Sequence, residues 1–403
     1  MTALPVSVVI VSHERPNELC LALTAVTQLD FANFEIVVVA DAAGVNAVRA
    51  HKFANQIKIV SFNALNISAA RNAGVAAAAG VVIAFIDDDA VPDPSWLTHL
   101  TAPLIDPTVS ATGGYVLGRN GISFQWKART VGRDAQTKAL LLDSDAPGVF
   151  RGSPMRAIKT EGTNMAVRRD VIVALGGFDE AFQFYLDETD LNMRLGQMGH
   201  KTVIVPLARV HHKYAESTRR RLDRVPTDLT QIGASLAVFL RKYGGSLDIL
   251  DIERDTQRRR LLIHMVAGRL LPSDVNSLLI GFDCGCTAGK LRKFGCAVAD
   301  TKPPSFLKFT HTMGQLRFVV GRAWRKKALC AKAVCLVRAG DRVVVIILSP
   351  TAFCHRVQFV EAGYWLWTGG QFGKVCKSEK FFQIVSLRSR VKIITKILYP
   401  ENI

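Results

Sequence analysis

The sequence lacks an uncharged run long enough to cross a membrane and lacks the closely spaced cysteines of a zinc site. Its longest uncharged stretch of note, residues 73–86, is shorter than the roughly 20 residues that a transmembrane helix needs. The eight cysteines include no CxxC pair, and a disulfide framework is typical of short secreted chains rather than of 403 residues. We therefore expect buried, reduced thiols in a soluble, cytoplasmic protein.

A signal peptide and low-complexity sequence are also missing. Residues 1–11 are apolar, but no Lys or Arg precedes the apolar stretch, so we interpret it as a first strand. No repeat is visible along the chain. With 49% hydrophobic and 21% charged residues, the composition excludes a disordered, collagen-like or coiled-coil protein, and the length suits two or three domains.

Acidic residues are scarce in the second half of the chain, which makes the net charge of +17 uneven. Residues 1–225 hold 23 Lys and Arg against 22 Asp and Glu, a balance of +1. Residues 226–403 hold the remaining 28 basic and 12 acidic residues, a balance of +16. This excess suggests an anionic partner, either a membrane surface, a nucleic acid or a charged substrate, and a solvated basic surface is the simpler alternative. Because no nucleic-acid recognition motif is present, we do not expect nucleic acid as the partner.

Short apolar runs alternate with helical patterns in the first 205 residues. Continuous apolar strands that alternate with helices indicate a mainly parallel α/β sheet covered on both faces. The predicted strands are residues 5–11, 35–39, 57–62, 81–86 and 201–205. The predicted helices are residues 67–79, which Gly80 ends, and residues 187–199, whereas residues 109–165 show no firm period.

The rest of the chain predicts helices followed by a small α/β unit. Apolar residues recur at helical spacing over residues 229–243, and residues 253–280 continue in helical style. A strand, a helix and a strand then follow over residues 316–348, a small βαβ pattern. We therefore predict three regions: a catalytic domain over 1–225, a helical region over 226–300 and a basic accessory α/β region over 301–403.

Three adjacent carboxylates, Asp87, Asp88 and Asp89, follow the apolar strand at residues 81–86 directly. Carboxylates at positions i and i+2 of a loop at the carboxyl end of a parallel strand can face one hard cation, and open α/β sheets bind ligands at this edge. A solvated acidic turn would explain the same residues. From composition alone, both interpretations stay open.

Five motifs, in order, resemble the family 2 glycosyltransferases of the GT-A fold. They are VVIVSHERP, ISAARNAG, FIDDDAVPDPSWL, EGTNMAVRRDVIVALGGFDEAF and YLDETDLNMRLGQMGHKTVIVPLARVHH, and together they extend over about residues 5–215. The resemblance implies a Rossmann-like catalytic domain with a mixed, mainly parallel sheet. It also implies a nucleoside-diphosphate sugar as donor and a divalent metal, Mn2+ or Mg2+, as cofactor.

Within this resemblance, the first motifs supply the donor site. Ser12, Glu14 and Arg15 correspond to residues near the base and ribose, and Arg71 to a residue that lines the nucleotide pocket. Where the family has two acidic residues followed by Gly-Ser, this chain has residues 40–43 (ADAA), so only Asp41 is left to accept a hydrogen bond from the base.

The acidic triplet matches the DXD motif of the family. The resemblance assigns Asp89 to the metal, Asp87 to the ribose or the metal, and Asp88 to the nucleotide sugar. The family often places a His after a later strand, where it completes the metal shell or contacts the diphosphate. Here that position is His211 or His212, and we favour His212.

The acidic segment Asp187-Glu188-Thr189-Asp190 matches the family position of the catalytic base. An inverting transfer needs a carboxylate that takes the proton of the acceptor hydroxyl. By position that base is Glu188, with Asp190 as the alternative, although carboxylates at a helix start are also favoured by the helix dipole. The preceding GGFDE segment corresponds to the acceptor-side loop, which makes Asp179 a candidate to bind an acceptor hydroxyl.

The sequence therefore predicts a metal-dependent, inverting glycosyltransferase of surface polysaccharide synthesis, with a glycan or lipid-linked acceptor. A nucleotidyltransferase is one alternative, and an inactive GT-A protein that binds membrane or nucleic acid is another. We expect a cytoplasmic enzyme whose basic C-terminal part, through Trp324 and the cations at 325–327, contacts the inner, anionic face of the membrane. An ordinary helix surface would explain the same segment, and core packing would explain the aromatic residues at 364–373.

Overall fold

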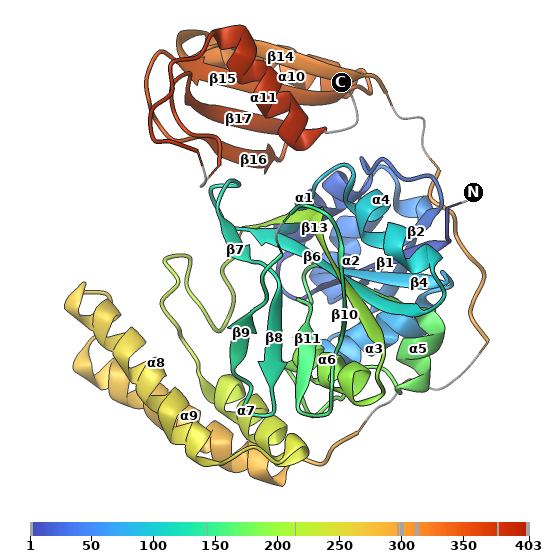
Figure 1. Cartoon of the computed structure of the whole chain (residues 1–403), viewed down its shortest axis with the longest axis vertical. Coiled ribbons are helices and arrows are strands. Elements are labelled where there is room, and N and C mark those ends of the chain that lie inside the picture. The colour runs from blue at the N-terminus through green and yellow to red at the C-terminus, as the bar shows by residue number, and fades with distance from the viewer. Residues whose placement is uncertain are drawn as a thin grey trace.

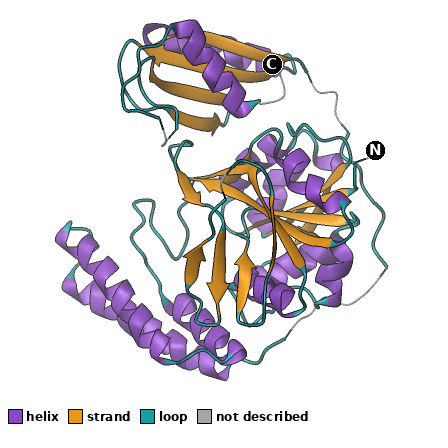
Figure 2. Ribbon diagram, in the orientation of Figure 1, coloured by secondary structure: helices purple, strands orange, loops and turns teal. Residues whose placement is uncertain are grey.

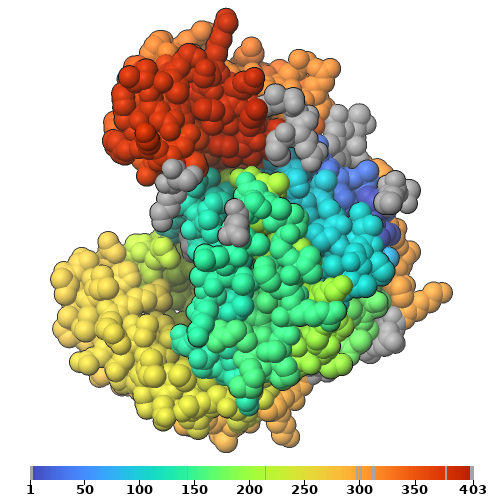
Figure 3. Space-filling model, in the orientation of Figure 1, coloured from blue at the N-terminus to red at the C-terminus, as the bar shows by residue number. Residues whose placement is uncertain are grey.

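A computed structural model describes residues 3–142, 144–213, 215–295, 298, 302–310, 314–376 and 379–399. The chain forms an N-terminal sheet domain, a helical region that extends from it, and a C-terminal α/β unit (Figure 1, Figure 2). In the space-filling view the helical region (yellow) and the C-terminal unit (red) flank the sheet domain (Figure 3).

The first half of the central sheet consists of parallel strands joined by helices. Strand β1 lies between β2 and β4, and β3 forms the edge beyond β2. These strands are buried along most of their length, which explains why they are continuous apolar runs in the sequence. The bounds are β1 Val6–Ser12, α1 Pro16–Val26, β2 Phe34–Ala40, α2 Ala42–Arg49, η1 Ala54–Gln56, β3 Ile57–Ser61, α3 Ile67–Ala77 and β4 Val82–Asp87.

The second half of the sheet comes mostly from residues without a clear sequence period. Strand β12 pairs antiparallel with both β4 and β6, and β13 pairs parallel with β6, so the sheet is mixed and mainly parallel, as predicted. Strand β13 is longer than predicted and ends at the two histidines. The bounds are β5 Ala90–Pro92, α4 Trp96–Thr101, η2 Ala102–Ile105, β6 Val109–Leu117, β7 Phe124–Trp126, β10 Gly148–Arg151, β12 Met165–Arg168, α5 Arg169–Ala174, α6 Asp187–Gln197 and β13 Lys201–His212.

A second, three-stranded sheet in the order β11-β8-β9 stands beside the central one. Its strands are β8 Arg129–Gly132, β9 Thr137–Ala139 and β11 Arg156–Lys159. Strands β8 and β11 pair antiparallel, which brings Lys159 opposite Arg129. These strands therefore carry basic side chains to the edge of the sheet domain.

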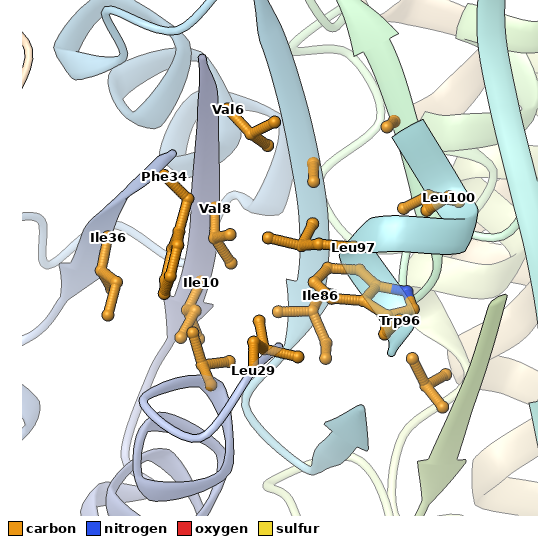
Figure 4. Packing of buried hydrophobic residues seen from close by; sticks show 14 of the residues in the cluster. Val6, Val8, Ile10, Leu29, Phe34, Ile36, Ile86, Trp96, Leu97 and Leu100 are labelled. Atoms are coloured by element: carbon orange, nitrogen blue, oxygen red, sulfur yellow. The ribbon is translucent and has the colours of Figure 1, made fainter. Parts of the chain in front are cut away.

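The core on one face of the central sheet is formed by aliphatic strand residues and two aromatic anchors (Figure 4). Ile10 and Phe34, from neighbouring strands, are at most 1% exposed. Trp96 at the start of α4 is fully buried, and its indole N–H donates to Oδ1 of Asn164 at 2.8 Å. Truncating such a side chain to Ala costs about 3–5 kcal/mol, so this core fixes the strand ends on which the site is built.

Three helices follow the sheet domain: α7 Thr230–Tyr243, α8 Asp248–Val266 and α9 Pro272–Leu291. Helices α8 and α9 form a long hairpin, and α9 packs closely on α7. This packing needs glycine, because a Cβ at Gly285 would lie 1.9 Å from the carbonyl oxygen of Thr230. The predicted helical stretch over 253–280 is thus two helices with a turn between them.

The C-terminal unit is a four-stranded sheet in the order β14-β15-β17-β16 with two helices. Strands β14 and β15 are parallel and joined by α10, which confirms the predicted βαβ pattern. The aromatic stretch forms β17, where Trp365 and Trp367 are at most 3% exposed, so its role is core packing. The bounds are β14 Leu316–Arg322, η3 Ala323–Arg325, α10 Lys326–Arg338, β15 Arg342–Ser349, β16 Arg356–Val360, β17 Tyr364–Gly370 and α11 Leu387–Leu398.

The C-terminal unit docks on the sheet domain through specific contacts. Gln28, just after α1, donates to the carbonyl of Gly363 at 2.9 Å, and Lys213 donates to the carbonyl of Phe359 at 3.1 Å. Arg342 forms an ion pair with Asp30. Across the described residues, no helix is long and apolar enough to pass through a bilayer.

Candidate functional site

A cavity of about 1020 Å³ opens at the carboxyl ends of β1 and β4. Its walls come from the strand ends and from α3, the three-stranded sheet, the start of α6, the end of β13 and the helical region. This is the edge at which open α/β sheets bind ligands. Most of the residues predicted for the site lie here, although they come from distant parts of the sequence.

Two carboxylates and one imidazole of the cavity lining lie close together. Ligand atoms of Asp87, Asp89 and His212 all lie within 4.8 Å of one another. Nε2 of His212 is 3.1 Å from Oδ1 of Asp89, and its Nδ1 is 3.1 Å from Oε1 of Gln125. When Nδ1–H donates to Gln125, the Nε2 lone pair faces a carboxylate, an arrangement that a cation between them would stabilise. Two carboxylates and an imidazole can together hold a divalent cation.

Asp89 is held for this role by its neighbours. Its Oδ2 accepts from the backbone N–H of Ala215 at 2.8 Å and lies 3.5 Å from the guanidinium of Arg15. Burial by itself would raise the pKa of Asp89, but His212, Arg15 and the Ala215 N–H together hold it below its usual range. The carboxylate therefore stays ionised.

Asp88 points away from the Asp87–Asp89–His212 group. Its Oδ2 accepts from the Ser12 hydroxyl at 2.7 Å, and its Oδ1 lies 3.0 Å from the Arg15 guanidinium. Burial raises the pKa of Asp88 despite this cation. The middle residue of the triplet thus links the DXD turn to the end of β1, and the spacing i, i+2 leaves the outer two for a metal.

Of the residues predicted at the nucleotide end, Ser12, Glu14 and Arg15 line the cavity and Asp41 does not. Asp41 is the N-cap of α2: it accepts from the N–H of Gly44 at 3.0 Å and from the N–H of Glu14 at 3.2 Å. Glu14 has a φ of 56°, in the left-handed region that a non-glycine residue adopts at a cost. Asp41 therefore supports the turn next to the cavity.

Arg71 of α3 is buried and joins the two acidic motifs. It forms ion pairs with Asp187 at the start of α6 and with Oδ1 of Asp87 at 3.1 Å. The Arg71 guanidinium packs against Gly162, where any side chain would clash, because a Cβ at this position would lie 2.4 Å from Nη2. Arg71 lines the cavity, and its ion pairs connect Asp87 with Asp187 on the cavity wall.

Glu188 lines the cavity and is paired with a lysine that the sequence analysis did not identify. Lys159 Nζ lies 2.7 Å from Oε1 of Glu188 and 2.8 Å from the hydroxyl of Thr189. Burial, the largest single effect, opposes ionisation, but Lys159, Arg71 and the Thr189 hydroxyl together outweigh it and lower the pKa of Glu188 to about 2. The carboxylate is thus ionised and oriented.

Asp190, the alternative base, does not line the cavity. Residues two positions apart in an α-helix point about 200° apart, and Asp190 faces the protein interior while Glu188 faces the cavity. Its carboxylate contacts Lys242 at 2.6 Å, the Tyr243 hydroxyl at 2.7 Å and Arg194 at 2.8 Å. Its position does not support a catalytic role.

Asp179, predicted to bind the acceptor, lies in the same interior cluster. Its Oδ2 is 2.6 Å from Lys242 Nζ, and its Oδ1 accepts from the N–H groups of Ala181 at 3.0 Å and Gly295 at 2.9 Å. The side chain is buried and outside the cavity lining, so it fastens the GGFDE loop to α7. The position of Asp179 does not support acceptor binding.

The two histidines at the end of β13 point in opposite directions. His211 pairs with Asp93 at 2.8 Å, and its ring lies 4.8 Å from that of Trp365 in the C-terminal unit. His212 enters the cavity beside Trp126. Burial lowers the pKa of His212, but Asp89 and Asp87 outweigh it and raise the value above normal. Of the two, His212 is thus the one in position to hold a metal.

Several cavity residues were not identified from the sequence. Arg219 and Arg220 line the cavity, and neither was predicted for the site. Arg129 also lines it and forms an ion pair with Glu161. For Arg219 and Arg220, the signal that could have found them is the cluster of basic residues outside the predicted helices and strands, which suits an anionic ligand.

Residues 7–163 match the sequence profile described as Glycosyl transferase family 2. Over these residues the chain is similar to that family. The match includes the DXD turn and ends just before α5 and α6, which carry the later motifs. The mixed, mainly parallel sheet expected from the resemblance is present in the structure, and the profile match agrees with the expected GT-A domain.

Curated relatives align with parts of this chain. An O-antigen biosynthesis protein, RfbC, of Myxococcus xanthus is 28% identical over 251 residues, which is 55% of this chain and 18% of that protein. An N-acetylglucosaminyl-diphospho-decaprenol L-rhamnosyltransferase of Mycobacterium tuberculosis is 44% identical over 59 residues, 15% of this chain and 19% of that protein. The alignments thus span less than a fifth of these relatives' lengths.

Among solved structures, a mannosyltransferase of Pyrobaculum calidifontis in complex with GDP-Man and Mn2+ aligns over 72% of this chain and 88% of that chain. The TM-score is 0.45 and the sequence identity 15%.

Proposed function

We propose that this chain transfers a sugar from a nucleoside-diphosphate sugar to a hydroxyl group of an acceptor, with inversion at the anomeric carbon. The observation that carries the proposal is one cavity in a family 2 domain that holds both a metal-type group and a separate ionised carboxylate. The metal-type group is Asp87, Asp89 and His212, and the separate carboxylate is Glu188. A nucleotidyltransferase needs no such acceptor base, and no comparison favours it.

Asp87, Asp89 and His212 would hold a divalent ion, Mn2+ or Mg2+. When bound, such an ion offsets the negative charge that grows on the departing nucleoside diphosphate. Arg15, Arg219 and Arg220 add positive charge along the same cavity wall, and Ser12, Glu14 and Asp88 border the proposed nucleotide end. Arg71 keeps Asp87 in place through their ion pair.

Glu188 would act as the base in a single displacement. The acceptor oxygen attacks the anomeric carbon, the bond from that carbon to the diphosphate oxygen breaks, and the hydroxyl proton passes to Glu188. A carboxylate with a pKa of about 2 is weak towards a free alcohol, but the attacking oxygen becomes strongly acidic as the new bond forms. Lys159 orients the carboxylate and keeps it ionised until then.

We propose a glycan or lipid-linked acceptor in bacterial surface polysaccharide synthesis, at the cytoplasmic face of the membrane. The O-antigen and decaprenol-linked activities in the names of the two relatives support this. Basic residues of 226–403 would supply the membrane contact.

The division of the chain into regions 1–225, 226–300 and 301–403 stays a prediction.

The test is release of nucleotide from UDP-, GDP- and dTDP-sugars by the full chain, with and without Mn2+. A metal-dependent release of nucleoside diphosphate supports transfer, and release of pyrophosphate from a nucleoside triphosphate would support the nucleotidyltransferase instead. In parallel, a nucleoside diphosphate with Mn2+ should raise the melting temperature, because it binds only the folded state. No release and no shift with any nucleotide would contradict the proposal.

A further inference from the structure

The turn of the α8–α9 hairpin has an unusual composition. Turns between helices are ordinarily polar, but residues 261–272 read LLIHMVAGRLLP. Ile263, Val266 and Leu271 are 70%, 84% and 65% exposed. The hairpin extends away from the sheet domain, so the fold leaves these aliphatic side chains without a protein cover among the described residues (Figure 1).

Arginines surround this apolar turn. Residues 256–273 contain four of them, at 258, 259, 260 and 269, and no Asp or Glu. Acidic residues directly flank this stretch: Asp255 precedes it in α8, and Asp274 follows it in α9, where its Oδ2 accepts from the backbone N–H of Leu271 at 2.8 Å. Between these two carboxylates every charged side chain is an arginine, so the turn is basic as well as apolar.

The loop before α7 adds to the same surface. Arg221 donates to the carbonyl of Arg269 at 3.3 Å, and Arg260 donates to the carbonyl of Arg224 at 3.4 Å. Leu222 in this loop is 64% exposed. We call the surface of Leu222, Ile263, Val266, Leu271 and the surrounding arginines the hairpin tip.

The hairpin tip adjoins the cavity. Arg219 and Arg220, in the same loop as Leu222, line the cavity, and so does Arg260 of α8. A surface that the tip contacts would therefore lie close to the cavity on the side of the helical region.

We propose that the hairpin tip inserts its aliphatic side chains into an anionic lipid bilayer, with the arginines at the level of the headgroups. Exposed aliphatic residues with flanking arginines are what an interfacial element needs. A second copy of the chain fits less well, because self-association would bring the same arginines together. Nucleic acid would use the arginines but not the aliphatic side chains.

This inference deepens the proposed function, because it locates the membrane contact and brings a lipid-linked acceptor to the cavity. The membrane contact then lies on the helical region, whereas the sequence alone predicts it at Trp324 and the following cations. Trp324 is 74% exposed in η3, directly before α10, so the two surfaces can be tested against each other.

The experiment is co-sedimentation of the full chain with phosphatidylcholine vesicles, with and without phosphatidylglycerol, at low and high salt. The test variant is I263S/V266S/L271S. Its matched control is I252S/I280S, which removes aliphatic side chains of 53% and 52% exposure from the same two helices. A third variant, R258S/R259S, tests the charge, and W324S/K326S/K327S tests the alternative surface.

We expect binding to anionic vesicles that high salt weakens. The affinity of the I263S/V266S/L271S variant for anionic vesicles should fall by at least about tenfold, and the matched control should bind like the wild type. Each arginine contributes roughly fivefold near an anionic surface, so the double arginine variant should also bind less and respond less to salt. All variants change exposed side chains, and their melting temperatures should match that of the wild type.

Three results would overturn the inference. If the wild type binds no vesicles, the membrane contact itself fails, while nucleotide release without lipid still tests glycosyl transfer separately. If only W324S/K326S/K327S loses binding, the contact lies on α10. If the tip variant binds vesicles normally but changes the molar mass measured by light scattering, the tip is an interface between copies.

Discussion

Lys159 Nζ and Glu188 Oε1 lie 2.7 Å apart on the wall of the cavity, joining the three-stranded sheet to the start of α6. The pair is largely buried, and Lys159 is also 3.6 Å from Glu161. Removing one charge of such a pair leaves the other charge unpaired and poorly solvated. The two residues therefore give separate, measurable predictions.

Glu188→Gln should lower turnover by about 10²–10⁴-fold, the usual contribution of a positioned base. The amide keeps the shape of the side chain but cannot take a proton, so donor affinity should change little. Steady-state transfer kinetics and nucleotide binding measure the two effects. If turnover stays within a few-fold of the wild type, Glu188 is not the base.

The matched variant is Asp190→Asn in the same helix. Asp190 is fully buried with Lys242, Tyr243 and Arg194. This change should therefore lower the melting temperature, while the protein that stays folded should keep most of its turnover. A variant with normal stability and a 10²-fold loss of turnover would return the catalytic role to Asp190.

Lys159→Met should move the acidic limb of the turnover profile to higher pH. The ammonium lowers the pKa of Glu188 to about 2, so its loss raises that pKa. A base with a higher pKa is protonated, and therefore inactive, at a higher pH than in the wild type. Lys159→Arg, which keeps the charge, is the control. An unchanged acidic limb in Lys159→Met would show that Glu188 does not set it.

Asp89→Ala should abolish the metal-dependent part of nucleotide binding, because it removes one ligand of the Asp87–Asp89–His212 group. The stabilisation of the protein by a nucleoside diphosphate with Mn2+ should disappear, and a chelator should have the same effect on the wild type. Asp106→Ala, at an exposed carboxylate outside the cavity, is the control. Retention of full transfer activity by Asp89→Ala in a chelator would refute the metal assignment.

The C-terminal unit should lose stability in mild acid through His355. Its Nδ1 accepts from the indole N–H of Trp367 at 2.6 Å, and its Nε2–H donates to the carbonyl of Gly370 at 2.8 Å. A second proton at Nδ1 would displace the indole hydrogen bond. Burial, the main cause, lowers the pKa of His355 from 6.5 to about 4.

A group with a lowered pKa contributes stability above its unfolded pKa and loses that contribution as the pH falls towards the folded value. The unit should therefore lose up to about 3 kcal/mol between pH 6.5 and pH 4. Tryptophan fluorescence in urea at several pH values measures this loss. His355→Phe should be less stable at neutral pH but should depend less on pH over that window, and an equal dependence in both proteins would exclude His355 as the cause.

Local patterns in the sequence were enough to predict β1, β4, α3, α6 and the small βαβ pattern. Parallel strands buried on both faces are continuous apolar runs, and a helix start or stop depends on a few neighbouring residues. The DXD turn could be identified for the same reason, since it is contiguous and directly follows a buried strand. The pairing of Lys159 with Glu188 could not, because the two residues come from separate elements that meet only in the folded sheet domain.

What the sequence by itself determined is the set of chemical groups: three adjacent carboxylates, an acidic helix start and two histidines at a strand end. Which of these groups face one another was decided by the tertiary structure alone. Neighbouring residues of β13 point to opposite faces, so only the pairing of β13 with β5 and β6 directs His212 into the cavity and His211 towards Trp365. In the same way, α6 turns Glu188 towards the cavity and Asp190 towards Lys242, because the helix is packed on α7 with one particular face inward.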